Sequence, residues 1–165
     1  PDRVEDAMEQ HQLVLELIPY LLSVSPLDCE ALDLLFGFDF TYRGNHNQLV
    51  AEALGLPPAF ERLADIGSSS VISYEPSFTV ALDDECRVQC RLSVESRTNA
   101  YQVRTGDFPE EQLSVYFTAR QYGSLNPDTT YVDALSNLTR ICREAVDNYV
   151  IDQVLQPLAR TIAMR

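Results

Sequence analysis

The sequence predicts an α+β domain, in which helices cover one face of an antiparallel sheet of about four to five strands. Two patterns indicate this fold class. Apolar residues recur at helical spacing near both ends of the chain, and the middle alternates apolar and polar residues with the period of half-buried antiparallel strands. A chain of 165 residues can bury about 70% of its unfolded surface. We therefore expect one domain over residues 1–165, with N-terminal helices and a long C-terminal helix.

Residues 1–33 are predicted to be helical. Apolar side chains recur at helical spacing over Val4–Leu22, and Pro19 should kink or end this first helix. Ser25-Pro26 is typical of a helix start, with serine as the N-cap and proline at the first helical position. A short second helix is therefore expected as far as about Asp33.

Residues 34–66 are predicted to form a strand and two short helices. The strand has an aromatic face made of Phe36, Phe38, Phe40 and Tyr42, which alternate with smaller or polar residues. Asn45 is a good N-cap for a helix that Gly55 ends. A second short helix is expected over residues 59–66.

Residues 71–122 are predicted to form an antiparallel meander. Its clearest strand is Cys86–Glu95, and the expected partner is Ile72–Leu82, with Pro76 at a bulge or an edge. After a break, pairing should resume through Tyr101–Arg104. The last strand should turn one apolar face inward, made of Leu113, Val115, Phe117 and Ala119.

Residues 128–164 are predicted to form one long helix that begins at Asp128 or Thr129 and is kinked at Pro157. At roughly 30 residues it would span about 45 Å, which is longer than a domain of this size needs. Either the helix bends back or part of it packs against another molecule.

The composition excludes several classes of function. All 12 of the Lys+Arg residues are arginine, so the chain has no lysine for a Schiff base or for a phosphate-binding loop. The formal net charge of -13 disfavours binding to nucleic acid or to an anionic membrane. Adaptation to high salt, or an arginine-rich coding bias, explains this acidic, lysine-free composition equally well.

The cysteines favour a cytoplasmic protein without a metal or another cofactor. The four are Cys29, Cys86, Cys90 and Cys142, and they lack the spacing of a zinc site, so we expect small buried residues in a reducing compartment. No stretch is long and apolar enough to span a membrane. Residues 1–12 do not resemble a signal peptide, and because the chain opens on Pro1 we expect its true start to be missing.

The loop after the aromatic strand is the first candidate site. Gly44-Asn45-His46 resembles the Gly-Asn-His triplet of the metallophosphoesterases, a family in which such residues contribute to a two-metal centre. That family needs further histidines, and this chain has only His11 and His46, so no metal is expected. The loop is interpreted as a glycine turn and a helix cap. Alternatively, Arg43, Asn45 and His46 hold a small anion at the helix start.

The polar face of the sheet is the second candidate site. An arginine and tyrosine stripe is expected there, made of Arg87, Arg91, Tyr116, Arg120 and Tyr122. It suits the carboxylates of a protein partner and, less well, single-stranded nucleic acid. Alternatively, acidic helices of the same chain or of a second copy cover this face. His11 is expected to be a buried structural histidine, and Asp83-Asp84-Glu85 a solvated turn.

The sequence contains no complete catalytic motif and favours a non-enzymatic interaction, adaptor or chaperone-like module that forms a homodimer. The alternative is a binder of a small anionic ligand, or an enzyme, that uses the loop Arg43–His46. The two hypotheses differ in the surface they require. A closed pocket lined by Phe40 or Tyr42 would favour the ligand binder, whereas a flat surface covered by helix would favour assembly.

Overall fold

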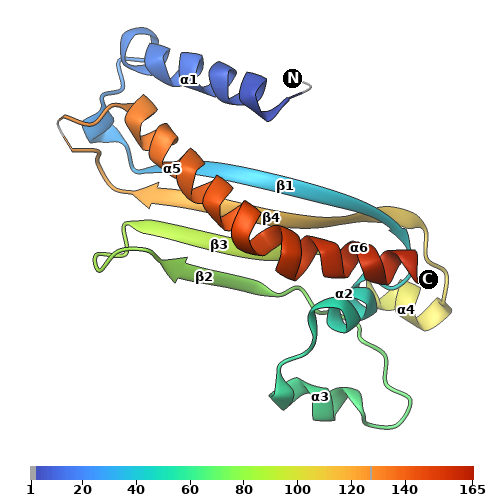
Figure 1. The fold of residues 1–165 in the computed structure, drawn as a ribbon. Helices are drawn as coiled ribbons and strands as arrows, with labels where there is room; N and C mark the ends of the chain where they lie inside the picture. The colour runs from blue at the N-terminus through green and yellow to red at the C-terminus, as the bar shows by residue number, and fades with distance from the viewer. Residues whose placement is uncertain (1–2, 127) are drawn as a thin grey trace. The chain divides into compact units, whose positions relative to one another are not determined.

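The structure is a computed structural model that describes residues 3–126 and 128–165. It contains a four-stranded antiparallel sheet with the strand order β1-β4-β3-β2, so the α+β class is confirmed (Figure 1). The strands are β1 (Ala31–Arg43), β2 (Ser77–Ala81), β3 (Val88–Glu95) and β4 (Glu110–Tyr122). The helices are α1 (Val4–Leu21), α2 (His46–Leu54), α3 (Pro58–Ala64), α4 (Ala100–Thr105), α5 (Tyr131–Ala145) and α6 (Gln156–Ala163).

The chain divides into two units, each with its own core. The first comprises Pro1–Leu35, Thr79–Cys90 and Thr118–Arg143, and the second comprises Phe36–Phe78, Arg91–Phe117 and Glu144–Arg165. Strands of the sheet and the C-terminal helical segment continue from one unit into the other along the chain. The expectation of a single domain stays a prediction.

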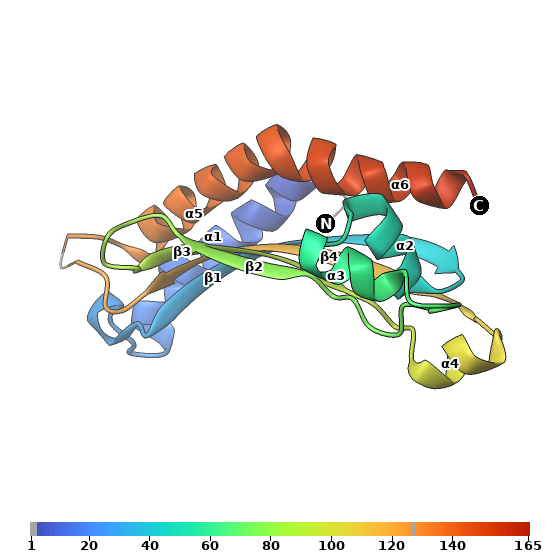
Figure 2. The same ribbon diagram turned by 90° about the horizontal axis from the view of Figure 1, so that it is seen from below.

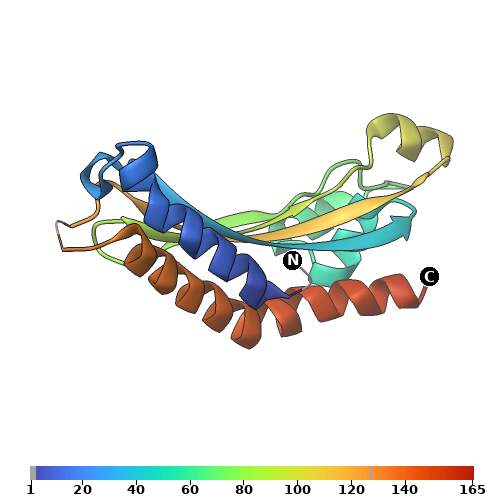
Figure 3. The same cartoon turned by 90° about the horizontal axis from the view of Figure 1, so that it is seen from above.

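In the first unit, α1 and α5 lie side by side (Figure 3). Their contact includes the Thr139 hydroxyl, which is 3.6 Å from the sulfur of Met8. The core beside them consists of Cys29, Leu125, Tyr131 and Ala134, with Leu15, Ile18 and Leu32 packed against it. The Cys142 thiol lies 3.7 Å from the Leu34 carbonyl oxygen, which places α5 against β1.

The start of the first unit differs from the sequence prediction. Pro19 lies inside α1, close to its end, and does not stop it. The predicted second helix is wrong, because only the 3-10 turn Pro26–Asp28 forms. The side chains of Ser25 and Asp28 cap each other's backbone and close this single turn. β1 then begins at Ala31, so the aromatic strand is longer than predicted.

In the second unit, α6 packs along α2 (Figure 2). The core here consists of Leu49, Val50, Leu113, Val115, Phe117, Val150, Val154 and Leu158, all of them buried. The predicted inward face of the last strand is therefore confirmed, and Ala119 is likewise buried in the first unit.

The long C-terminal helix is also confirmed. It consists of α5, the π-helical segment Val146–Leu155 and α6, without a gap. It begins later than predicted, because Thr130 and Asp133 form the cap: the Asp133 amide donates to the Thr130 hydroxyl at 3.1 Å, and the Thr130 amide donates to the Asp133 carboxylate at 2.9 Å. Pro157 is the second residue of α6, directly after the π-helical segment.

The meander contains two corrections. The predicted strand over Ile72–Leu82 is shorter, since β2 covers only its C-terminal part as an edge strand. The predicted strand at Tyr101–Arg104 is wrong, because α4 occupies this place. The Asn99 side chain accepts hydrogen bonds from the first amides of α4, and Gln102 bonds back to the Asn99 amide at 2.8 Å. Gly106, at φ 72°, ends this helix in a conformation that favours glycine.

Candidate functional site

The imidazole of His46 is used within the fold. His46 opens α2 and is 1% exposed. Because the Tyr42 carbonyl oxygen can only accept, the Nε2–H group donates to it, at 3.1 Å. Nδ1 then accepts the Arg97 amide at 3.5 Å, and the Thr98 hydroxyl accepts the His46 backbone amide at 2.9 Å. Both ring nitrogens therefore have a partner in the protein.

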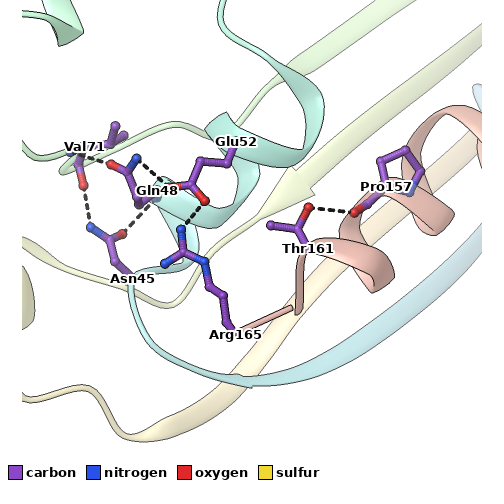
Figure 4. A network of polar contacts seen from close by, with 7 residues as sticks. All are labelled: Asn45, Gln48, Glu52, Val71, Pro157, Thr161 and Arg165. Carbon is purple, nitrogen blue, oxygen red and sulfur yellow. Dashed lines mark hydrogen bonds and ion pairs between the residues drawn. The ribbon is translucent and has the colours of Figure 1, made fainter. Parts of the chain in front are cut away.

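The neighbouring asparagines hold the segment 71–74 against α2. Asn45 accepts the Gln48 amide at 3.1 Å as the N-cap, and its side-chain amide donates to the Val71 carbonyl at 2.8 Å (Figure 4). Asn47 is 1% exposed, donates to the Ile72 carbonyl at 3.0 Å and accepts the Tyr74 amide at 2.8 Å. Sequence analysis missed Asn47, although it belongs to the same polar cluster.

Arg43 is the member of the predicted anion site with spare donors. Its Nε donates to the Phe108 carbonyl at 3.2 Å. Its two terminal nitrogens make no hydrogen bond to any residue that the structure describes. Arg43, Asn45 and His46 are neighbours in the sequence, but the side chains of Asn45 and His46 already form hydrogen bonds within the protein. Of the three, only Arg43 has side-chain donors for an anion among the described residues.

A groove lies between α2, α3 and the segment 69–74, which all belong to the second unit. Its volume is about 810 Å³. The large apolar side chains along it are Leu56, Phe60, Leu63, Ile66 and Ile72. The last four of these are between 53% and 65% exposed. The structure describes all of α3 and buries none of its residues, so this helix presents its apolar side chains to an open groove.

Polar groups line one side of this groove. The carboxylate of Glu52 forms an ion pair with the guanidinium of Arg165 and accepts a hydrogen bond from the Gln48 side chain at 3.0 Å (Figure 4). The hydrogen bond from Arg165, followed by that from Gln48, lowers the pKa of Glu52. Sequence analysis contained no signal for this pair, because its members lie far apart in the chain.

The predicted arginine and tyrosine stripe is divided between the two units. In the first unit, Arg120 bonds both oxygens of the Asp33 carboxylate and, at 2.9 Å, the Tyr122 hydroxyl. Hydrogen bonding to Asp33 is the main cause of a raised pKa for Arg120. Arg87 donates to the Tyr122 carbonyl at 3.3 Å and to the Ser124 carbonyl at 2.6 Å.

In the second unit, the stripe residue Arg91 is exposed and Tyr116 is half-buried. The Nε of Arg91 donates to the Ser77 hydroxyl at 3.0 Å. Arg91 also lines a polar depression of about 370 Å³, together with Glu75, Glu95 and Arg97. Guanidinium and carboxylate groups alternate there, so the depression is suited to a polar, mixed-charge segment of a partner.

Helix α1 carries an apolar face that points away from its core contacts. The face consists of Leu13, Val14, Leu17, Tyr20 and Leu21, which are between 41% and 83% exposed. At 100° per residue, these five fall on one side of the helix, whereas Leu15 and Ile18 turn toward the core. The sequence predicted one apolar face, and the helix has two. His11 is exposed, so the prediction of a buried histidine is wrong.

The cysteines behave differently from one another. Cys29, Cys90 and Cys142 are buried, and burial raises their thiol pKa, that of Cys142 to about 11. Cys86 contradicts the prediction, since it is exposed in a turn at φ 55°. Among residues 3–126 and 128–165, all four thiols are free and no cluster of three metal-binding side chains occurs. Within the same ranges, no helix has the length and apolar character that crossing a membrane requires.

No family model, no curated protein and no solved structure matches this chain.

Proposed function

We propose that this protein is a non-enzymatic interaction module that forms a homodimer through the outward apolar face of α1. The observation that carries the proposal is the set of five exposed apolar residues on one side of this helix. Leu15 and Ile18, on another side of α1, already pack against the core of the first unit. A helix that is apolar on both sides is typical of a helix buried between two layers.

The size of this face supports the proposal. Taking about 200 Å² as the full surface of a large apolar residue, the exposed fractions amount to roughly 600 Å². The largest apolar patch on a typical monomer covers roughly 300–600 Å² and is often functional. The face of α1 lies at the upper end of this range, and its exposure to water costs free energy that association would recover.

Sedimentation velocity over a range of protein concentrations tests the proposal. The wild-type chain is expected to sediment as a dimer. Leu17→Glu places a charge in the centre of the apolar face and is expected to give a monomer. Gln12→Glu adds the same charge to the same helix outside the apolar face, and should leave the dimer intact. A wild-type chain that stays monomeric at every concentration would refute the proposal.

The polar sheet surface is the part of the molecule that we assign to a further protein partner. Arg91 supports this assignment, because it is exposed and uses only its Nε in the hydrogen bond with Ser77. Arg120 supports it less, since Asp33 and Tyr122 already occupy its donors. Capture of a partner by the wild-type protein but not by Arg91→Glu is the expected result. Equal capture by both would remove Arg91 from the interface.

The alternative function is the binding of a small anion at the Arg43–His46 loop. The free terminal nitrogens of Arg43 favour it, because a guanidinium fork is suited to phosphate. Inorganic phosphate should then raise the melting temperature of the wild-type protein and leave that of Arg43→Ala unchanged. A wild-type melting temperature that does not respond to phosphate would dismiss this function.

A further inference from the structure

The groove beside α3 and the outward face of α1 are two apolar surfaces that stay exposed among the residues that the structure describes. The groove is walled by α2, α3 and the segment 69–74 and has a volume of about 810 Å³. The face of α1 extends over residues 13–21, or about 13.5 Å along the helix axis. Helix α3 is about 10 Å long by the same measure, so the two surfaces are similar in length.

We infer that α1 of one chain docks in the α2–α3 groove of a second copy, and that the second copy returns the same contact. This inference rests on the homodimer proposed above and names the surface that receives α1. An amphipathic helix in an apolar groove is a common mode of recognition. Each chain carries both surfaces, and a contact that the second copy returns is isologous, so one dimer interface would use both of them.

The area that each arrangement buries favours the groove over a direct contact between two α1 helices. A stable interface buries about 800 Å² on each partner. A contact of α1 with α1 uses only the roughly 600 Å² of that face. The four large exposed residues of the groove contribute roughly 470 Å² more on the same measure, so reciprocal docking offers roughly 1,100 Å² per chain. The first value lies at the lower end of the range for stable interfaces, roughly 600–1,000 Å² on each partner, and only the second exceeds the average of about 800 Å².

The wall of the groove is built to keep its shape. The segment 71–74 belongs to no strand or helix, yet the side chains of Asn45 and Asn47 hold its backbone at Val71, Ile72 and Tyr74. The Tyr74 hydroxyl donates to the Gly55 carbonyl at 2.9 Å and ties the same segment to the end of α2. A groove whose wall is held by side-chain hydrogen bonds is preorganised for a docking segment, which lowers the entropy cost of binding.

Mixing two defective variants tests the inference. Leu17→Glu damages the helix face, and Leu63→Glu damages the groove, so each variant alone is expected to be a monomer. An equimolar mixture should give a heterodimer in native mass spectrometry, because the intact α1 of the groove variant fits the intact groove of the helix variant. Ala59→Glu lies on α3 but does not line the groove, and it is the control that should remain a homodimer.

Each contrary outcome has a distinct meaning. If Leu63→Glu remains a dimer while Leu17→Glu does not, the dimer stands and the groove is not its docking surface. If both variants are monomers and the mixture does not assemble, reciprocal docking is refuted. A monomeric wild-type chain refutes the homodimer itself, and a retained apolar small molecule would identify a different occupant of the groove.

Cross-linking gives an independent measurement that does not depend on a charged substitution. In a Cys86→Ser background, Leu17→Cys and Leu63→Cys together should form a disulfide between two chains on mild oxidation. Non-reducing electrophoresis should then show a covalent dimer. A covalent dimer of the single Leu17→Cys variant in its place would indicate that two α1 helices meet each other and would overturn the inference.

Discussion

The substitution Asn47→Ala should destabilise the protein more than the same substitution at an exposed asparagine, because three backbone groups lose the partner that the buried Asn47 side chain gives them. The side chain of Asn47 donates to the carbonyls of Ile72 and Thr98, at 3.0 Å and 3.3 Å, and accepts the amide of Tyr74 at 2.8 Å. A hydrogen bond contributes about 1 kcal/mol to stability, so the expected loss for all three is roughly 3 kcal/mol. For a chain of this size, that corresponds to a fall of roughly 6–12 °C in melting temperature.

Thermal unfolding followed by circular dichroism measures this effect. Asn148→Ala is the matched control, since Asn148 also donates through its side chain, to the Glu144 carbonyl at 2.7 Å, but is exposed. It should change the free energy of unfolding by less than about 0.5 kcal/mol. Hydrogen exchange at the Tyr74 amide should accelerate in Asn47→Ala. A melting temperature equal to that of the control would refute the conclusion that the hydrogen bonds of Asn47 stabilise the groove wall.

Three further results are expected. In the native protein a thiol reagent should modify one cysteine of the four, and Cys86→Ser should abolish this reaction; labelling of Cys142, whose pKa is raised to about 11, would contradict its burial. Because the ion pair with Arg165 lowers the pKa of Glu52, its contribution is present above the ordinary glutamate pKa of 4.5 and is lost as the pH falls through the lowered value. Wild-type protein and Glu52→Gln should therefore differ by about 0.5 kcal/mol at neutral pH and converge in acid; a gap that persists in acid would exclude the ion pair as its cause. Since each chain carries a net charge of -13, added salt should strengthen the dimer by screening repulsion, and a dimer that dissociates with salt would indicate contacts between opposite charges instead.

The sequence was sufficient for the elements whose pattern is periodic and whose caps are local. The alternation of Leu113, Val115 and Phe117 identified the buried face of β4, and Asn45 with Gly55 identified both ends of α2. These signals are short-range, because burial on one face of a strand and hydrogen bonds at a helix end depend on residues a few positions apart. The cap of α4 is equally local, because Asn99 and Gln102 form a capping box. These two residues could have predicted the helix, but the apolar spacing of the segment favoured a strand.

The rest of the site depended on contacts between distant residues. The apolar residues Ile72 and Tyr74 alternate as in a strand, but Asn47 and Gly55 take the hydrogen bonds of this segment and hold it as a groove wall. In the sequence, the two apolar faces of α1 form one broad apolar pattern. Only the contacts of α1 within the first unit show which side is already covered. Periodicity indicates how apolar a helix is, but not how many neighbours it has.

The arginines of the stripe can bind either a partner or groups of their own chain. The sequence left open whether these arginines meet a partner or an acidic group of their own chain. Arg120 donates to both oxygens of Asp33 and to the Tyr122 hydroxyl at once, and Arg87 spans two backbone carbonyls. A lysine ammonium has no planar fork and cannot reproduce the two-point contact with Asp33. At these two positions the fixed geometry of arginine is used within the fold. Among the described residues, Arg91 makes one hydrogen bond, through its Nε, so it is the member of the stripe best placed to bind a partner.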